Sequence, residues 1–210
     1  MKILFYGLLG CWCLGSALAD EILEKQGNLY WQTAQTAPRQ LTRLGLDAQP
    51  ALSPDGQRVV FVRRQASVNP LNATDAPTEL WQVKLDGSQP QRLLAAREDS
   101  EPKNNLTDFS QPVFSLDGRS VYFNTAAWVT SGAIHRLDAG QTQPVFITDG
   151  DSIDLVDKGK YAGHLIVFKH KYRKNGGAND AYWLVSPQGR EVRRIGADEA
   201  AVQDFLRRQH

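Results

Sequence analysis

Cysteine is almost absent from this chain of 210 residues: the two present, Cys11 and Cys13, both lie in an apolar N-terminal stretch. If that stretch is removed, the remaining chain has no disulfide, no thiolate nucleophile and no cysteine to ligate a metal. The only methionine is Met1, which excludes a methionine-rich adaptable groove. Neither sign of charge is in excess, because 24 Lys and Arg face 23 Asp and Glu. No overall field therefore attracts nucleic acid, and we expect no nucleic-acid partner.

Residues 1–19 are typical of a secretory signal peptide. A short basic start at Met1-Lys2 precedes an almost unbroken apolar stretch over residues 3–18. That stretch is shorter than the roughly 20 apolar residues that a membrane-spanning helix needs. The segment Ala17-Leu18-Ala19 is a small-x-small cleavage site, and Asp20 opens a polar chain. The sequence therefore predicts cleavage between Ala19 and Asp20, a periplasmic location and no transmembrane segment after processing.

Two other fates of this N-terminal segment stay open. It could remain uncleaved as a membrane anchor. Alternatively, Leu8-Leu9-Gly10-Cys11 resembles the lipobox of bacterial lipoproteins, and processing there would leave Cys11 as the lipid-modified residue.

Internal repeats organise the rest of the chain. Gln49–Phe61 and Gln111–Phe123 share Gln, Pro, Ser, Asp, Gly and a closing Phe, with apolar residues in register between them. Each copy reads as a strand, a tight Asp-Gly turn and a second strand, because Asp-Gly readily adopts the positive φ that such turns need. We therefore predict that Asp55, Gly56, Asp117 and Gly118 are structural turn residues. A diverged third copy runs from Ile153 to Phe168.

A second element alternates with these boxes and carries aromatic or apolar strand residues. It occurs four times, at Leu29–Trp31, Leu80–Val83, Ile134–Leu137 and Tyr182–Val185. Each copy is followed by a turn and a further short strand. The repeating unit is thus four short strands over roughly 50 residues, which is typical of a propeller blade.

The Gln-Pro-x-x-Ser-Pro-Asp-Gly box resembles the repeat of TolB-type β-propellers, and related boxes occur in the propellers of prolyl-oligopeptidase and dipeptidyl-peptidase relatives. The resemblance covers roughly Leu29 to Ile195, although the second box has Leu116 where Pro is usual. In the peptidase relatives catalysis belongs to a separate hydrolase domain. The resemblance therefore implies a propeller fold and transfers no catalytic residue.

These patterns predict an all-β fold over residues 20–197, a partial or small β-propeller of about three to four four-stranded blades. The strand count gives two leading strands and then three sets of four. Residues 198–210 read as a short helix with Asp198 as its N-cap and Phe205 and Leu206 on an apolar face. We expect this helical tail to cover an exposed face or edge of a terminal blade. An open array also leaves a homo-oligomer as an alternative.

The sequence offers no recognisable catalytic or metal site. It contains no Gly-x-Ser-x-Gly elbow, and its four histidines show no metal-ligand spacing. We therefore expect no enzyme activity, no cofactor and no metal.

One basic cluster is the candidate binding patch. Lys169, Lys171, Arg173 and Lys174 lie in one strand, and Arg193 and Arg194 follow one hairpin later. Such a patch could meet an acidic partner, lipid headgroups or a sugar acid. The alternative is ordinary alternation of solvated charges on an exposed strand.

The preferred functional hypothesis is a non-catalytic periplasmic binding or scaffold protein whose repeat surface contacts another envelope protein. The alternative is a small-ligand or envelope-glycan binder. That alternative requires a tryptophan exposed in a concave site, whereas Trp31, Trp81 and Trp183 recur at repeat positions typical of a core.

Overall fold

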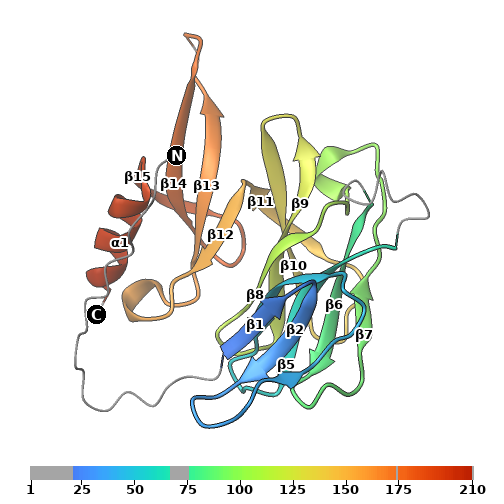
Figure 1. The fold of residues 1–210 in the computed structure, drawn as a ribbon. Helices are drawn as coiled ribbons and strands as arrows, with labels where there is room; N and C mark the ends of the chain where they lie inside the picture. The colour runs from blue at the N-terminus through green and yellow to red at the C-terminus, as the bar shows by residue number, and fades with distance from the viewer. Residues whose placement is uncertain (1–20, 67–75, 174, 210) are drawn as a thin grey trace, which may run out of the picture.

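The computed structural model describes residues 21–66, 76–173 and 175–209. These residues form four antiparallel sheets, one of three strands and three of four, followed by one α-helix (Figure 1). Within each sheet the hydrogen-bonded order follows the order in sequence, so every sheet is a simple meander. We call the sheets blades 1 to 4. The all-β fold predicted from the repeats is confirmed.

The strand bounds follow the predicted repeat closely. Blade 1 holds β1 (Glu21–Lys25), β2 (Asn28–Gln32) and β3 (Arg39–Gln40). Blade 2 holds β4 (Asp47–Leu52), β5 (Arg58–Arg64), β6 (Thr78–Lys84) and β7 (Gln91–Leu94). Blade 3 holds β8 (Ser110–Phe114), β9 (Ser120–Trp128), β10 (Ser131–Asp138) and β11 (Val145–Asp149). Blade 4 holds β12 (Ser152–Leu155), β13 (Leu165–Tyr172), β14 (Ala178–Val185) and β15 (Glu191–Gly196). Two short 3₁₀ turns, Pro102–Asn104 and Gly159–Tyr161, lie in the connections.

Blade 1 differs from the predicted strand count because it has three strands where the sequence suggested two. The additional strand is β1, which pairs along its whole length with β2, from Glu21 opposite Gln32 to Lys25 opposite Asn28. Its sequence, with charged residues at three of five positions, shows little of the β-branched and aromatic enrichment typical of strands.

Side chains that alternate along the second strand of a blade pack the blade against both of its neighbours. On β5, Val59 and Phe61 pack in the core shared with blade 1, whereas Val60 and Val62 pack in the core shared with blade 3. This division follows from the two-residue period of a strand, which sends neighbouring side chains to opposite faces. Full burial of such side chains contributes about 1.5–3 kcal/mol each. One strand therefore stabilises two junctions.

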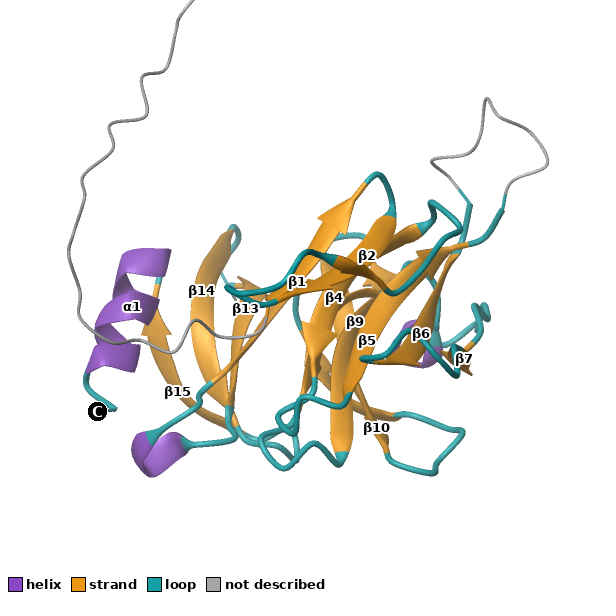
Figure 2. Ribbon diagram, turned by 60° about the horizontal axis from the view of Figure 1, so that its bottom comes forward, coloured by secondary structure: helices purple, strands orange, loops and turns teal. Residues whose placement is uncertain are grey.

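The same alternation continues at the other end of the array. Leu165 and Val167 of β13 face the core shared with blade 3, and Ile166 faces away from it. Ile166 is covered by α1 (Glu199–Arg207), whose Val202 and Phe205 are buried against it. Figure 2 shows α1 beside β15 at one side of the molecule. The helix occupies the position where a further blade would pack.

The helix begins where the sequence predicted. Asp198 is its N-cap, and the Asp198 carboxylate accepts a hydrogen bond of 2.9 Å from the N–H of Ala201. That bond satisfies one of the backbone donors left free in a first helical turn. None of the described helices is long and apolar enough to cross a bilayer.

Side-chain to backbone hydrogen bonds link successive blades near their inner strands. The Gln49 N–H donates to Glu24 Oε2 (3.1 Å), the Gln111 N–H donates to Gln49 Oε1 (2.6 Å), and the Ile153 N–H donates to Gln111 Oε1 (3.2 Å). Both glutamines have positive φ, 52° and 50°, where the register of the strand pair shifts. We call these contacts the glutamine ladder. They give the Gln of each Gln-Pro box a physical role.

The described strands do not close into a ring by sharing a sheet. β1 contacts β4, β4 contacts β8, and β8 contacts β12, in chain order. Across residues 21–66, 76–173 and 175–209, no sheet combines strands from blade 1 with strands from blade 4.

Candidate functional site

The two Asp-Gly pairs of the repeat boxes lie in tight turns. Gly56 and Gly118 both have φ of 67°, a backbone conformation that glycine adopts without steric cost. Each aspartate carboxylate accepts a hydrogen bond from the serine hydroxyl two residues earlier, Ser53 for Asp55 and Ser115 for Asp117. These hydroxyl bonds are the main reason that the pKa of each aspartate is lowered. The Ser-x-Asp-Gly core is thus a self-contained turn.

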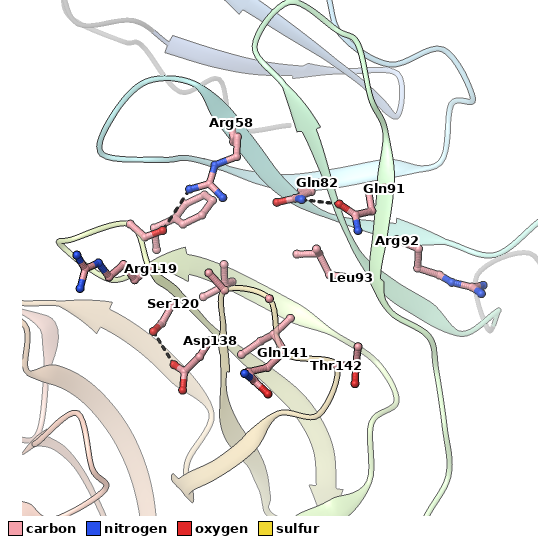
Figure 3. A pocket seen from close by; sticks show the side chains of 16 residues that line it. Arg58, Gln82, Gln91, Arg92, Leu93, Arg119, Ser120, Asp138, Gln141 and Thr142 are labelled. Atoms are coloured by element: carbon pink, nitrogen blue, oxygen red, sulfur yellow. Dashed lines mark hydrogen bonds between the residues drawn. The ribbon is translucent and has the colours of Figure 1, made fainter.

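The second of these turns borders a pocket of about 320 Å³ between blades 2 and 3 (Figure 3). Its floor is apolar and includes Leu93, Phe114, Val121 and Leu137. Its rim is polar and includes Arg58, Gln82, Gln91, Arg92, Arg119, Ser120, Asp138, Gln141 and Thr142.

Several rim groups of this pocket are held by one another. Arg58 donates to the Gly118 carbonyl (3.2 Å) and lies over the ring of Phe114. The Ser120 hydroxyl donates to Asp138 (2.7 Å), and this bond is the main cause of the lowered pKa of Asp138. The described lining residues include no histidine, lysine or cysteine to act as a base near neutral pH. The pocket thus presents a polar rim around an apolar floor.

The predicted basic patch is divided by the structure. The ammonium of Lys169 is buried at the junction of blades 3 and 4, where it donates to Thr148 (2.6 Å), Asp149 (2.7 Å) and Glu191 (2.9 Å). Lys171 is paired with Glu191 and lies 3.7 Å over the ring of Trp183. The charges of these two lysines are therefore already neutralised within the molecule.

The other members of that patch lie apart. Arg193 lies over the ring of Phe205 on the side covered by α1, and its neighbour Arg194 points to the opposite face of β15. Arg173 is exposed and has no ion-pair partner among the described residues. Lys174, like the predicted cleavage residues Ala19 and Asp20, falls outside the described residues.

The β9–β10 and β13–β14 hairpins end at the same side of the molecule (Figure 1). Residues of both hairpins line a second hollow, which we call the hairpin hollow. Its volume is about 570 Å³. It is lined by Trp128, Val129, Thr130, Ser131, Phe146, Asp149, His170 and Tyr172. Three of these side chains are unusually exposed for their type: Trp128 at 41%, Tyr172 at 71% and Val129 at 105%.

Contacts between the two hairpins give the hairpin hollow its shape. The Thr130 and Tyr172 hydroxyls lie 3.2 Å apart and join blade 3 to blade 4. On the blade 3 side, the ring of Trp128 meets Phe146 edge-on at 6.3 Å. On the blade 4 side, His170 packs edge-on against Tyr172 at 4.8 Å, and its Nδ1 lies 2.6 Å from an oxygen of Asp180. The hollow thus combines aromatic faces with several polar groups.

The sequence reasoning missed Trp128 and Val129. The sequence feature that could have identified them is an apolar pair at the tip of a hairpin, where polar turn formers are expected. Tyr172 lies between Lys171 and Arg173 of the predicted basic patch but was not itself predicted as a site residue. The three repeat tryptophans do pack against the core, Trp31 and Trp81 between blades 1 and 2 and Trp183 between blades 3 and 4.

His135, which aligns with Trp31, Trp81 and Trp183 in the repeat, is buried on β10 within blade 3. Its ring stacks on Phe123 at 5.5 Å, and its Nε2 donates to the Lys103 carbonyl (3.0 Å), which can only accept. Burial lowers the pKa of His135, so its ring is neutral near pH 7. In the part of the chain that the structure describes, no group of three or more His, Cys, Asp or Glu side chains is placed to hold a metal ion.

Comparison with known proteins gives a structural match without a sequence match. No family model matches the chain, and no curated protein matches it in sequence. TolB from Acinetobacter baumannii superposes with a TM-score of 0.57 and 19% identity, covering 86% of this chain and 41% of TolB. Porphyromonas gingivalis dipeptidyl peptidase 4 gives 0.56 and 12%, covering 85% and 31%. The β-propeller domain of the Trilobed protease from Pyrococcus furiosus, which has an open velcro topology, gives 0.55 and 12%, covering 86% and 54%.

The chain spans between 31% and 54% of the length of these three structures. At identities this low the likeness concerns the fold alone, and function must come from the site. The four meander sheets and these matches together show that the chain has the β-propeller fold found in TolB and in the propeller domains of peptidases.

Proposed function

We propose that this protein is a non-catalytic binding module of the bacterial periplasm that contacts another envelope protein through the hairpin hollow. The observation that carries this proposal is the exposure of Trp128, Val129 and Tyr172 around one hollow. Exposed apolar residues gathered in one place mark interaction sites, and Trp and Tyr are enriched among the residues that dominate binding energy. The periplasmic location rests on the signal-peptide pattern of residues 1–19.

Site-directed photo-crosslinking tests this proposal. A photoreactive residue at Val129, in the protein expressed in a Gram-negative host, should yield a discrete crosslinked protein. The matched control is Leu116, which is as exposed as Trp128, at 41%, but lies in the turn at the opposite end of β9. Trp128→Ser should remove the product at Val129. Equal products from Val129 and Leu116, or none from either, would contradict the proposal.

The alternative function, a small-ligand or envelope-glycan binder, has one observation in its favour. Trp128 is the partly exposed tryptophan in a concave site that this function requires, and polar groups from Thr130, Ser131 and Asp149 line the same hollow. Small-ligand sites combine aromatic walls with a few placed polar groups in this way.

Tryptophan fluorescence separates the two functions. Titration with soluble peptidoglycan fragments should change the emission of the wild-type protein under the alternative, and Trp128→Phe should abolish the change. A saturable response to these fragments, without a crosslinked protein at Val129, would favour the ligand-binding function.

A further inference from the structure

Strand β13 is longer than β12, the strand that pairs with it on one side. β12 pairs with β13 only from Leu165 to Phe168. β13 continues to Tyr172 and remains paired with β14 on its other side along that whole length. Within the described part of the chain, the segment Lys169–Tyr172 therefore has a strand neighbour on one side only.

The backbone groups that face this open side can be identified from the hydrogen bonds at each end of the segment. The Phe168 carbonyl accepts from the Asp151 N–H (3.0 Å), so Phe168 directs its backbone groups toward β12. The Arg173 N–H donates to the Gly177 carbonyl (2.9 Å), so Arg173 directs its backbone groups across the hairpin. Because backbone direction alternates along a strand, the N–H and C=O of His170 and Tyr172 point to the open side.

These four backbone groups make no hydrogen bond with the described residues. They present two donors and two acceptors in the spacing of a β-ladder. An unpaired strand edge is a template for a further strand, and many proteins recognise extended peptides in this way. The same two residues line the hairpin hollow, and the Tyr172 hydroxyl reaches Thr130 there, so the open edge and the apolar surface belong to one site.

The charges near the edge indicate what such a strand should carry. Lys169 and Lys171 are neutralised by Asp149 and Glu191, as described above. Arg173, next to Tyr172 toward the tip of the hairpin, is exposed and has no carboxylate partner among the described residues. A strand added at this edge would therefore gain from an acidic residue opposite Arg173.

We propose that the partner binds as an extended peptide segment that adds to the open edge of β13 at His170 and Tyr172. This inference rests on the proposed function in protein binding. Backbone bonds to His170 and Tyr172 hold the segment, and its alternate side chains are apolar and enter the hollow between Trp128 and Tyr172. An acidic side chain near one end meets Arg173. Apolar residues are expected at every second position of the peptide because every second side chain of a strand points to the same face.

Peptide selection provides the first test. A phage-displayed library of random dodecapeptides is selected on the full-length protein, with counter-selection on Tyr172→Ser. Enriched sequences should carry apolar residues at every second position and an acidic residue near one end. Trp128→Ser and Tyr172→Ser should each weaken binding of an enriched peptide roughly tenfold or more, as truncation of a binding hot spot does. Leu116→Ser, at the opposite end of blade 3, should leave its affinity unchanged.

Amide exchange measured by NMR provides the second test, because strand addition has an alternating signature. In the free protein the amides of His170 and Tyr172 should exchange fast, and those of Lys169 and Lys171 slowly. A saturating enriched peptide should slow exchange at His170 and Tyr172 by roughly tenfold or more and leave the two lysines unchanged.

Other occupants give different results, and each would overturn the inference. A second copy of the chain would protect His170 and Tyr172 in a concentration-dependent way without peptide. A saccharide would bind without protecting either amide. Failure to enrich any peptide that discriminates against Tyr172→Ser would also overturn it. If these tests fail while Val129 still crosslinks to a protein, the proposed function stands and only strand addition is wrong. If Val129 forms no crosslink either, both are wrong.

Discussion

At the scale of single residues, the Asp-Gly pair and the Gln-Pro pair of the repeat box have different structural roles. The Asp-Gly pair forms the turn between the first two strands of the blade, β4 and β5 in blade 2 and β8 and β9 in blade 3. The Gln-Pro pair lies at a register shift, where a positive φ directs the Gln N–H toward the preceding blade. Neither role needs a ligand. The repeat box that predicts the fold from the sequence therefore has a structural role in turns and blade contacts.

Substitution of Gly56 tests the role of the turn. No heavy atom lies within 4 Å of the position that a Cβ at Gly56 would occupy, so the cost of a side chain there is backbone strain alone. We expect Gly56→Val to lower the free energy of unfolding by roughly 1–3 kcal/mol. Gly56→Asn should cost less, because Asn tolerates the left-handed region. Urea unfolding measures both. Equal stability of Gly56→Val and wild type, with loss of partner binding, would make the turn a contact site.

At the scale of elements, the junction between blades 3 and 4 depends on a buried ammonium. For Asp149, burial raises the pKa, but the hydrogen bond and charge of Lys169, together with smaller contributions from a backbone hydrogen bond and the Thr148 hydroxyl, lower it by more. For Glu191, burial again raises the pKa, and the hydrogen bonds and charges of Lys171 and Lys169 together lower it by more. Both carboxylates therefore have lower pKa values in the folded state, and their contribution is lost as the pH falls through those values.

The pH dependence of stability follows from these shifts. The free energy of unfolding should decrease as the pH falls below the ordinary carboxylate values of 3.8 and 4.5. Lys169→Met should reduce this acid-dependent loss. At pH 7 it should cost less than the roughly 3–5 kcal/mol of a fully buried broken pair, because both carboxylates reach solvent. Lys171→Met, which keeps the buried ammonium, should retain the acid dependence that comes from Asp149 and lose part of that from Glu191. Identical urea midpoints for Lys169→Met and wild type from pH 7 to pH 3 would contradict this.

Sequence reasoning reached most of these elements but little of the site. Blades 2 to 4 and α1 were predictable because apolar alternation, turn formers and the Asp198 cap act locally. Strand β1 was missed, since it forms through pairing with β2 and little in its own composition marks it. The burial of Lys169 depends on Asp149 and Glu191, which only the packing of two blades brings together. The open edge at His170 depends on where β12 starts, which no local pattern specifies.

At the scale of the whole molecule, α1 completes one end of the array. Val202 and Phe205 cover Ile166 and Leu184 of blade 4. Phe205→Ala should lower the free energy of unfolding by about 3–5 kcal/mol, as expected for a buried Phe.

Deletion of residues 198–210 should expose the apolar face of blade 4 and drive self-association, measured by sedimentation velocity. Arg207→Ala on the exposed side of the helix serves as the control. A truncated protein that stays monomeric and equally stable would show that α1 is dispensable for the fold.

The glutamine ladder also has a direction, and this has a consequence for how the chain assembles. In each contact the acceptor oxygen belongs to the earlier blade and the N–H belongs to the later one. Every blade also consists of strands that are consecutive in the chain. As the chain emerges from the ribosome, each blade can therefore form from adjacent strands and dock onto one already in place. In this order α1 follows blade 4 and covers its apolar face.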